Sequence, residues 1–198
     1  MTGYKNQPQV YELSDDRFLF VFDPKEMSIG GRGDIYTRAY FSLSIRRTQK
    51  VREDHANGRI HTTDHWIYYS KYKEQLVNKI DELIDELGNC LDVSRDLLNF
   101  SYRSLDILSS KSEDYGLEKV QAELYDNLVA YVGEVIRRRL KGHWIVRESY
   151  QGHQYPLIDI KDGVSPILVV WQCLNEIEQI NLRKACTREI RRASLSYR

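Results

Sequence analysis

The sequence has few of the residues that identify a chemistry at once. Its 198 residues include three cysteines, Cys90, Cys173 and Cys186, and no two of them are spaced as CxxC. An odd number without that spacing argues against a disulfide scaffold and against a zinc knuckle. No stretch approaches the 18 consecutive apolar residues of a membrane span, and MTGYKNQPQV lacks the apolar core of a secretory signal. We therefore expect a cytoplasmic protein with reduced thiols and no membrane contact.

The chain also lacks a net charge, but its charges are unevenly distributed. Residues 1–73 carry 12 Lys/Arg against 9 Asp/Glu, residues 74–126 carry 5 against 13, and residues 127–198 carry 12 against 7. The balances are therefore +3, −8 and +5. An acidic middle and a basic end suit a protein partner of mixed charge at least as well as a nucleic acid.

The first third of the chain has the pattern of β-strands. Residues 17–22 form a short apolar run, and residues 30–34 (GGRGD) are glycine-rich and indicate a turn. Residues 35–46 alternate between apolar and polar with period two, as in a strand with one face on the core. Asn57-Gly58 indicates a turn, and residues 59–70 are rich in β-forming residues. We therefore predict N-terminal antiparallel strands, with residues 35–46 and 59–70 paired as a hairpin.

The rest of the chain is predicted to be mainly helical. Apolar residues with helical spacing mark the segments 72–87, 117–136 and 165–180. Gly88 is placed to end the first helix, and Ser165-Pro166 to begin the last one. Residues 109–114 are expected to form a polar loop, and a basic tail follows the last helix.

A second, short hairpin is expected between the helices, with residues 144–147 paired to residues 155–160. The order β-β-β, α, α, α, β-β, α predicts an α+β protein with N-terminal antiparallel strands, central helices, a second short hairpin and a C-terminal helix. We expect a single domain over residues 1–198. The alternative division is a β-rich part, 1–72, and a helical part with a hairpin, 73–198.

One stretch resembles a known kind of protein. Tyr131-Val132-Gly133-Glu134, then Gly142, Trp144, Pro156 and Ser165-Pro166, form a Y-x-G-E helix followed by a hairpin and another helix. Residues 117–170 thereby resemble small uncharacterised bacterial proteins of domain-of-unknown-function or immunity type. The resemblance implies a bacterial protein and no catalytic residues. Glycine within a helix costs about 1 kcal/mol against alanine, so we expect Gly133 to make a close contact with the hairpin or with the following helix. We expect Glu134 to cap a helix or to form hydrogen bonds with backbone groups in that contact.

The cluster Asp54, His55, His61, Asp64 and His65 is the one that suggests metal or acid–base chemistry. On a helix, HTTDH would place two imidazoles on one face. On the strand that we expect, His61 and His65 lie about 13 Å apart at roughly 3.3 Å per residue. We therefore assign no metal ligand, no cofactor and no catalytic residue, and neither a GxSxG nor a Walker pattern is present. A metal-dependent hydrolase or nuclease using His55, His61 and His65 is the third hypothesis.

Binding is the leading hypothesis for function. Tyrosine and arginine are enriched where proteins bind one another, and 14 tyrosines occur in the chain. We expect a non-enzymatic protein that binds another protein through Tyr36, Arg38, Tyr40, Arg46, Arg59 and His61. The alternative is that a helix, 71–87 or 165–180, covers this strand face as a second layer of the core.

Nucleic-acid binding is the second hypothesis. It would use the same strand face together with the basic tail, whose cations are Arg183, Lys184, Arg188, Arg191 and Arg192. The tail can instead dock on the acidic segment 74–126 of its own or a second chain. We therefore also keep a homo-oligomer, formed by docking between two chains, as an alternative.

Overall fold

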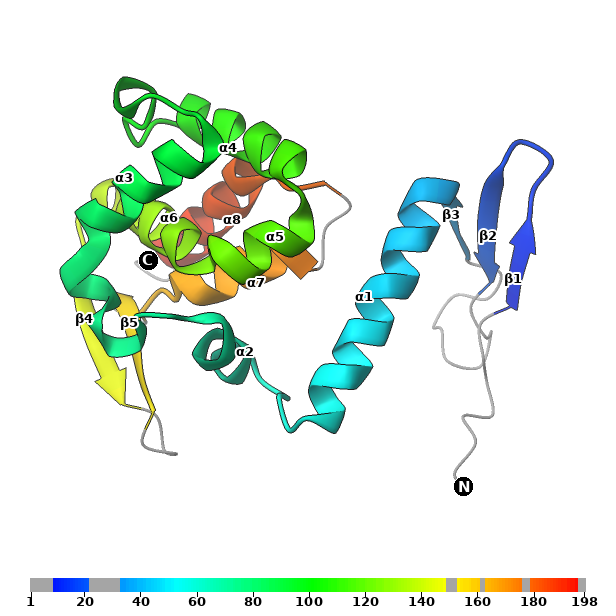
Figure 1. The fold of residues 1–198 in the computed structure, drawn as a ribbon, viewed down its shortest axis with the longest axis horizontal. Helices are drawn as coiled ribbons and strands as arrows, with labels where there is room; N and C mark the ends of the chain where they lie inside the picture. The colour runs from blue at the N-terminus through cyan, green and yellow to red at the C-terminus, as the bar shows by residue number, and fades with distance from the viewer. Residues whose placement is uncertain (1–8, 22–32, 149–152, 161–162, 176–178, 196–198) are drawn as a thin grey trace. The chain divides into compact units, whose positions relative to one another are not determined.

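The computed structural model describes residues 9–21, 33–148, 153–160, 163–175 and 179–195 (Figure 1). The chain divides into two compact units, Met1–Asn57 and Gly58–Arg198. It combines two small antiparallel sheets with helices, so the predicted α+β class is confirmed.

The first unit is a three-stranded antiparallel sheet followed by one long helix. The strands are β1 (Gln9–Glu12), β2 (Arg17–Val21) and β3 (Gly33–Thr37), in the spatial order β1-β2-β3, and the helix is α1 (Arg38–Ala56). β2 confirms the strand predicted over residues 17–22 as far as Val21, and residue 22 lies outside the described residues. Of the glycine-rich turn, residues 30–32 lie outside the described residues, while Gly33 and Asp34 belong to β3.

The predicted strand over residues 35–46 is wrong beyond Thr37. The Thr37 hydroxyl accepts the backbone N–H of Tyr40 at 3.2 Å, so Thr37 caps the start of α1. A capping threonine satisfies a helix N–H that otherwise has no partner. The alanine, leucine and arginine residues that follow favour a helix. The alternating pattern alone therefore did not distinguish a strand from this capped helix.

The predicted strand over residues 59–70, and with it the N-terminal hairpin, is also wrong. Residues Thr62–Tyr69 form helix α2, and Asp64 accepts the backbone N–H of His61 at 2.9 Å. This side chain closes the first turn of the helix from its third position. Residues 47–56, expected in the tip of a hairpin, continue α1 instead.

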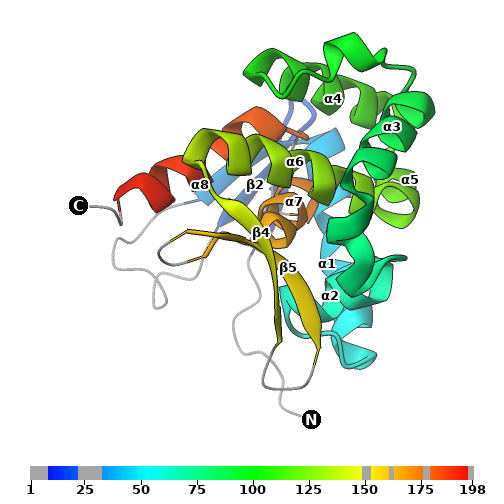
Figure 2. The same ribbon diagram turned by 90° about the vertical axis from the view of Figure 1, so that its left-hand side faces the viewer.

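The second unit is helical around one buried helix. Its further elements are η1 (Lys73–Lys79), α3 (Ile80–Leu91), η2 (Arg95–Leu97), α4 (Tyr102–Tyr115), α5 (Leu117–Glu123), α6 (Tyr125–Leu140), β4 (His143–Glu148), β5 (Gln154–Asp159), α7 (Pro166–Asn175) and α8 (Leu182–Leu195). Every residue of α6 from Tyr125 to Ile136 is buried, and α6 contacts α3, α7 and α8 (Figure 2). The core of the unit therefore surrounds α6.

Several helix boundaries differ from those that the apolar stripes predict. Gly88 lies inside α3, which ends at Leu91 with Asp92 in the left-handed conformation. The expected polar loop at residues 109–114 belongs to α4. The predicted helix over residues 117–136 is two helices, α5 and α6, separated at Leu124. An apolar stripe reports which face is buried, so it continues across such breaks without marking them.

The second hairpin and the start of α7 are confirmed. β4 and β5 pair antiparallel, with Trp144 opposite Ile158 and Arg147 opposite Tyr155. The Ser165 hydroxyl accepts the backbone N–H of Leu168 at 3.3 Å, immediately before Pro166. Residues 149–152, between β4 and β5, and residues 161–162, after β5, lie outside the described residues.

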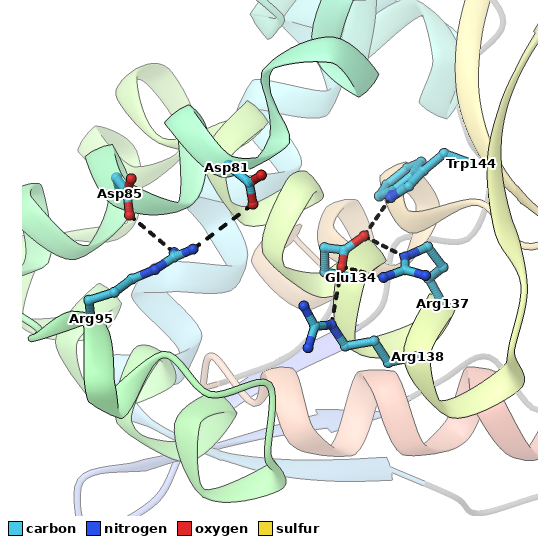
Figure 3. A network of polar contacts seen from close by, with 7 residues as sticks. All are labelled: Asp81, Asp85, Arg95, Glu134, Arg137, Arg138 and Trp144. Atoms are coloured by element: carbon cyan, nitrogen blue, oxygen red, sulfur yellow. Dashed lines mark hydrogen bonds and ion pairs between the residues drawn. The ribbon is translucent and has the colours of Figure 1, made fainter.

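The predicted close contact of Gly133 is confirmed, and its partner is the hairpin residue Trp144. A Cβ on Gly133 would overlap ring atoms Cζ2 and Cη2 of Trp144 and would lie 3.1 Å from Cγ of Pro166. Glu134 Oε1 accepts the indole N–H of Trp144 at 2.9 Å (Figure 3). The prediction that Glu134 caps or bonds backbone is replaced by this side-chain contact. The glycine and the carboxylate together hold β4 against α6.

Tyr131 gives the same motif a contact on another side of α6. Its hydroxyl donates to Oγ of Ser104 at 2.6 Å and accepts the backbone N–H of Phe100 at 3.0 Å. The ring stacks on that of Phe100 with centroids 5.1 Å apart. The Y-x-G-E residues are therefore structural in this chain: they fasten two neighbouring segments to the central helix.

Glu134 is a buried carboxylate whose charge is balanced by two arginines. Arg137 Nε and Nη2 donate to it at 2.7 and 2.9 Å, and Arg138 Nε donates at 3.2 Å (Figure 3). Burial by itself would raise the pKa of Glu134, but the hydrogen bonds from Arg137, Trp144 and Arg138 outweigh it and lower the pKa below the ordinary 4.5.

A substitution at Glu134 is therefore expected to have a pH-dependent effect. A lowered pKa means that the ionised carboxylate stabilises the fold above pH 4.5, and that this contribution is lost as the pH falls through the lowered pKa. Glu134→Gln should reduce the free energy of unfolding by about 2–3 kcal/mol at neutral pH. The deficit should shrink in acid, as urea denaturation at a series of pH values would measure.

The matched control is Glu82→Gln. Glu82 also pairs with a cation three residues away, Lys79 at 2.7 Å, but its side chain is 65% exposed. Exposed pairs contribute little, so this variant should resemble the wild type at every pH. A Glu134→Gln deficit that stays constant from neutral to acidic pH would contradict the assignment.

Candidate functional site

The structure does not bring the predicted partner-binding residues onto one strand face. Tyr36 lies in β3, Arg38, Tyr40 and Arg46 lie in α1, and Arg59 and His61 belong to the second unit. The predicted Tyr/Arg strand face is therefore wrong, because it required residues 35–46 to form one strand. Whether these six residues bind a partner stays a prediction.

Tyr36 and Tyr40 instead belong to an aromatic cluster inside the first unit. The ring of Phe41 on α1 stacks on Phe18 of β2 with centroids 4.3 Å apart. Tyr36 lies edge-on to Phe20 at 5.2 Å and to Tyr40 at 4.7 Å. Burial, with the nearby Asp34 carboxylate, raises the pKa of Tyr36. A helix does cover this side of the sheet, as the alternative interpretation held, but the helix is α1.

Arg38 is likewise engaged within its own unit. It forms ion pairs with Glu12 and with Asp16, the latter at 2.6 Å from Nε to Oδ1. Its guanidinium also lies 5.1 Å from the centroid of the Phe18 ring. These contacts connect the start of α1 to the β1–β2 turn.

The other face of the sheet carries an apolar row that sequence reasoning missed. Tyr11 lies opposite Leu19, and Leu19 lies opposite Ile35, so the three side chains cross β1, β2 and β3 in one register. Because Phe18 and Phe20 point toward α1, the alternation of the strand directs Leu19 to the opposite face. Tyr11 is 50% exposed and Ile35 is 52% exposed.

We call these three residues the sheet row. The sequence signal for it was present, since Ile35 and Leu19 are apolar strand residues. The prediction nevertheless placed Ile35 on the core, because it assumed that the apolar side of residues 35–46 was the buried one. Only the pairing of β2 with β1 and β3 assigns the row to its face.

The basic C-terminal residues, predicted as a tail after the last helix, form a further helix, α8, that packs on the core. Leu182, Ala185 and Cys186 of α8 are buried in the core of the second unit. Arg183 pairs with Asp106 of α4 at 2.9 Å, and the Ile180 N–H donates to Glu113 at 2.9 Å. The segment thus docks on the acidic middle of its own chain.

Two more of the five cations are also occupied. Arg188 Nη2 donates to Oε1 of Gln172 at 2.5 Å, and Arg192 forms two hydrogen bonds with Glu189 at 2.9 and 2.6 Å. Lys184 and Arg191 are exposed on the same helix. Nucleic-acid binding through Arg183, Lys184, Arg188, Arg191 and Arg192 stays a prediction.

The histidines are placed by helices and not by a strand. His55 lies near the end of α1, His61 precedes α2 and His65 lies within it, so the strand distance used against a metal site does not apply. The buried His65 ring lies tilted against the Trp171 ring, with centroids 4.0 Å apart. In the part of the chain that the structure describes, no three or more His, Cys, Asp or Glu side chains are grouped as metal ligands.

Comparison of the chain with protein-family models, with curated proteins and with solved structures finds no match. The resemblance of residues 117–170 to small bacterial proteins therefore stays a prediction. No helix among the described residues is long and apolar enough to cross a bilayer.

Proposed function

We propose that the chain works by binding another protein through the sheet row of its first unit. The observation that carries the proposal is the in-register set Tyr11, Leu19 and Ile35, in which exposed Tyr11 and Ile35 flank the half-buried Leu19. An apolar row of this kind loses water when a complementary apolar surface covers it, at about 25 cal/mol per Å² of buried apolar area. Its position across three strands makes it a continuous surface.

The small core of the first unit supports the same proposal. Among its described apolar side chains, Phe18 alone is buried, whereas Val10, Tyr11, Ile35, Ile45 and Val51 are exposed. A unit of this size buries little of its apolar surface by itself. A bound partner would supply the missing apolar contact.

The charges on the sheet face favour a protein over a nucleic acid. Arg17 shares the strand parity of Leu19, and it is hydrogen-bonded to Asp15 at 2.7 Å. A surface whose arginine is neutralised by a neighbouring carboxylate offers little to phosphates. Tyr11 beside aliphatic residues is instead the composition of a protein–protein interface. The partner is thus expected to present apolar side chains.

The first test places a photo-crosslinking amino acid at Tyr11. The matched control is the same amino acid at Tyr68 of α2, which is 56% exposed in the second unit. Irradiation in a lysate of the source cells should yield a discrete adduct from position 11 and none of that mass from position 68. Peptide mapping of the adduct would identify the partner, or a second copy of this chain.

The second test measures binding of the identified partner by titration. Tyr11→Ser combined with Ile35→Ser is expected to weaken it at least about tenfold, because the central apolar contact is lost. The control pair is Ile60→Ser with Leu195→Ser, two exposed apolar residues of the second unit. Unchanged affinity for the Tyr11/Ile35 variant, with circular dichroism like that of the wild type, would show that the sheet row is not the binding surface.

A further inference from the structure

The second unit contains an open cleft, separate from the sheet row, with a volume of about 680 Å³. Four segments meet around it: the start of α2, the β4–β5 hairpin, the residues that precede α7, and α8. α7 packs against β5, α2 and α8, which keeps these segments together (Figure 2). The volume lies in the range of sites for small molecules.

Arg147 forms one wall of the cleft. It lies on β4 opposite Tyr155, and both side chains line the cleft. Its two terminal nitrogens come within 3.7 and 3.8 Å of the position that a Cβ on Gly163 would take. Gly163 has φ +70°, where glycine is favoured, and the position of its missing Cβ lies in van der Waals range of the guanidinium. No described carboxylate is paired with Arg147.

The segment beneath Arg147 is held to the hairpin by backbone hydrogen bonds. Val164 and Ile158 exchange N–H to carbonyl bonds, both 2.9 Å long. Because Val164 is bonded to β5, its two chain neighbours, Gly163 and Ser165, are held next to the hairpin. The hydroxyl of Ser165 accepts from Leu168, which leaves its own hydrogen available to donate.

Arg192 of α8 supplies a second guanidinium. Glu189, which is 9% exposed, holds it through two hydrogen bonds, so its orientation is set by a side chain of the same helix. The lining thus carries two arginines and one glutamate, an excess of one positive charge besides His61. The field in the cleft favours an anion.

The remaining lining residues are of two kinds. Thr62, Thr63 and Ser165 offer hydroxyl donors from two helix starts, and Leu157 and Leu168 offer an apolar wall. A carboxylate needs one arginine fork, whereas a phosphate has oxygens directed to several sides and takes donors from each. Donors from β4 and from the two helix starts approach the cleft from different sides, as a phosphate requires.

We propose that this cleft binds a small organic phosphate. Arg147 contacts the phosphate oxygens, the hydroxyls of Ser165 and Thr62 donate to them, and the organic group lies against Leu157 and Leu168. Arg192 stays in its pair with Glu189 and forms the α8 side of the cleft. The site lies in the second unit, so it does not depend on protein binding by the sheet row.

The experiment uses calorimetric titration of the full chain with three probes. Phenyl phosphate carries both the phosphate and an apolar group, inorganic phosphate lacks the apolar group, and benzoate carries a carboxylate in place of the phosphate. Phenyl phosphate is expected to bind at least about tenfold more tightly than either of the others. It alone carries both a phosphate for the hydrogen-bond donors and an apolar ring for Leu157 and Leu168. No heat of binding for phenyl phosphate at millimolar concentration would overturn the proposal.

Two variants locate the binding. Arg147→Met should weaken phenyl phosphate at least about tenfold, while Arg191→Met, which removes an exposed arginine of α8 outside the cleft lining, should leave it unchanged. Leu168→Glu adds a carboxylate at a residue that is 38% exposed, where the fold tolerates a polar group, and should abolish binding. Equal affinities in Arg147→Met and Arg191→Met, or full binding by Leu168→Glu, would assign the phosphate elsewhere and overturn the proposal.

Discussion

Replacing Gly133 with alanine is expected to destabilise the second unit by about 2 kcal/mol or more. This sign is opposite to that of an ordinary helix position, where alanine stabilises by about 1 kcal/mol over glycine. The added Cβ would overlap the ring of Trp144, and Pro166 Cγ lies 3.1 Å from it on another side. The ring cannot turn away freely, since its N–H is bonded to Glu134. Urea denaturation monitored by circular dichroism would measure the loss.

A double-mutant cycle separates this contact from a general effect on α6. Trp144→Ala is destabilising by itself, because a packed aromatic side chain is lost. In the Trp144→Ala background, however, Gly133→Ala should become neutral or stabilising by up to about 1 kcal/mol, as helix propensity alone predicts. If Gly133→Ala costs the same with and without the indole, the proposed contact does not decide the role of the glycine.

Replacing Asp126 with alanine is expected to destabilise the same unit by about 3 kcal/mol. Asp126 Oδ2 accepts three donors: the Ser70 hydroxyl at 3.0 Å and the backbone N–H groups of Lys71 and Tyr72 at 2.7 and 3.1 Å. Asp126 itself is buried at the start of α6. Alanine would leave these donors without their acceptor, and the junction between α2 and η1 would lose its attachment to α6.

The matched variant Asp126→Asn keeps a carbonyl oxygen for the three donors, so it should retain more of the stability than alanine. Burial raises the pKa of Asp126 above its ordinary 3.8, and the hydrogen bonds from Ser70, Lys71 and Tyr72 only partly oppose this. A raised folded-state pKa gives a contribution that is fully present below 3.8 and is lost as the pH rises through the folded value.

The stability of the wild type relative to Asp126→Asn should therefore increase as the pH is lowered toward 3.8. Urea denaturation of both proteins at a series of pH values would measure this difference. A relative stability that falls in acid would contradict the raised pKa. Equal stability of the alanine and asparagine variants would contradict the role of the acceptor.

The parts of the fold that the sequence predicted correctly depend on local signals. Ser165 before Pro166 specifies a helix start with few alternatives. The hairpin of β4 and β5 consists of two short β-forming runs that are close in the chain. Gly133 in a strong helix indicated a close neighbour, because a glycine there is unfavourable unless something occupies its missing side chain.

The errors arose where one pattern fitted two structures. Residues 38–46 alternate in polarity as a strand does, but a capping hydrogen bond from the Tyr40 N–H to Thr37 begins a helix there. His61 and Asp64 likewise begin α2 in a segment rich in β-forming residues. The break at Leu124 left no mark on the apolar stripe. In each case a few hydrogen bonds outweighed weak intrinsic preferences.

The candidate sites were less accessible to sequence reasoning than the fold was. The sheet row joins residues 11, 19 and 35, and the cleft joins Thr62, Arg147, Gly163 and Arg192, which are spread over 131 positions of the chain. No spacing rule relates such residues, and only pairing and packing bring them together.

The sequence by itself determined the class of the fold, the second hairpin, the start of α7 and the need for a contact at Gly133, because each of these depends on residues close in the chain. Tertiary structure alone decided which strands pair in the first unit, which sheet face α1 covers, and where the basic residues of α8 dock. Those outcomes depend on competition among distant apolar and charged groups for the same neighbours, and that competition is resolved only when the chain packs.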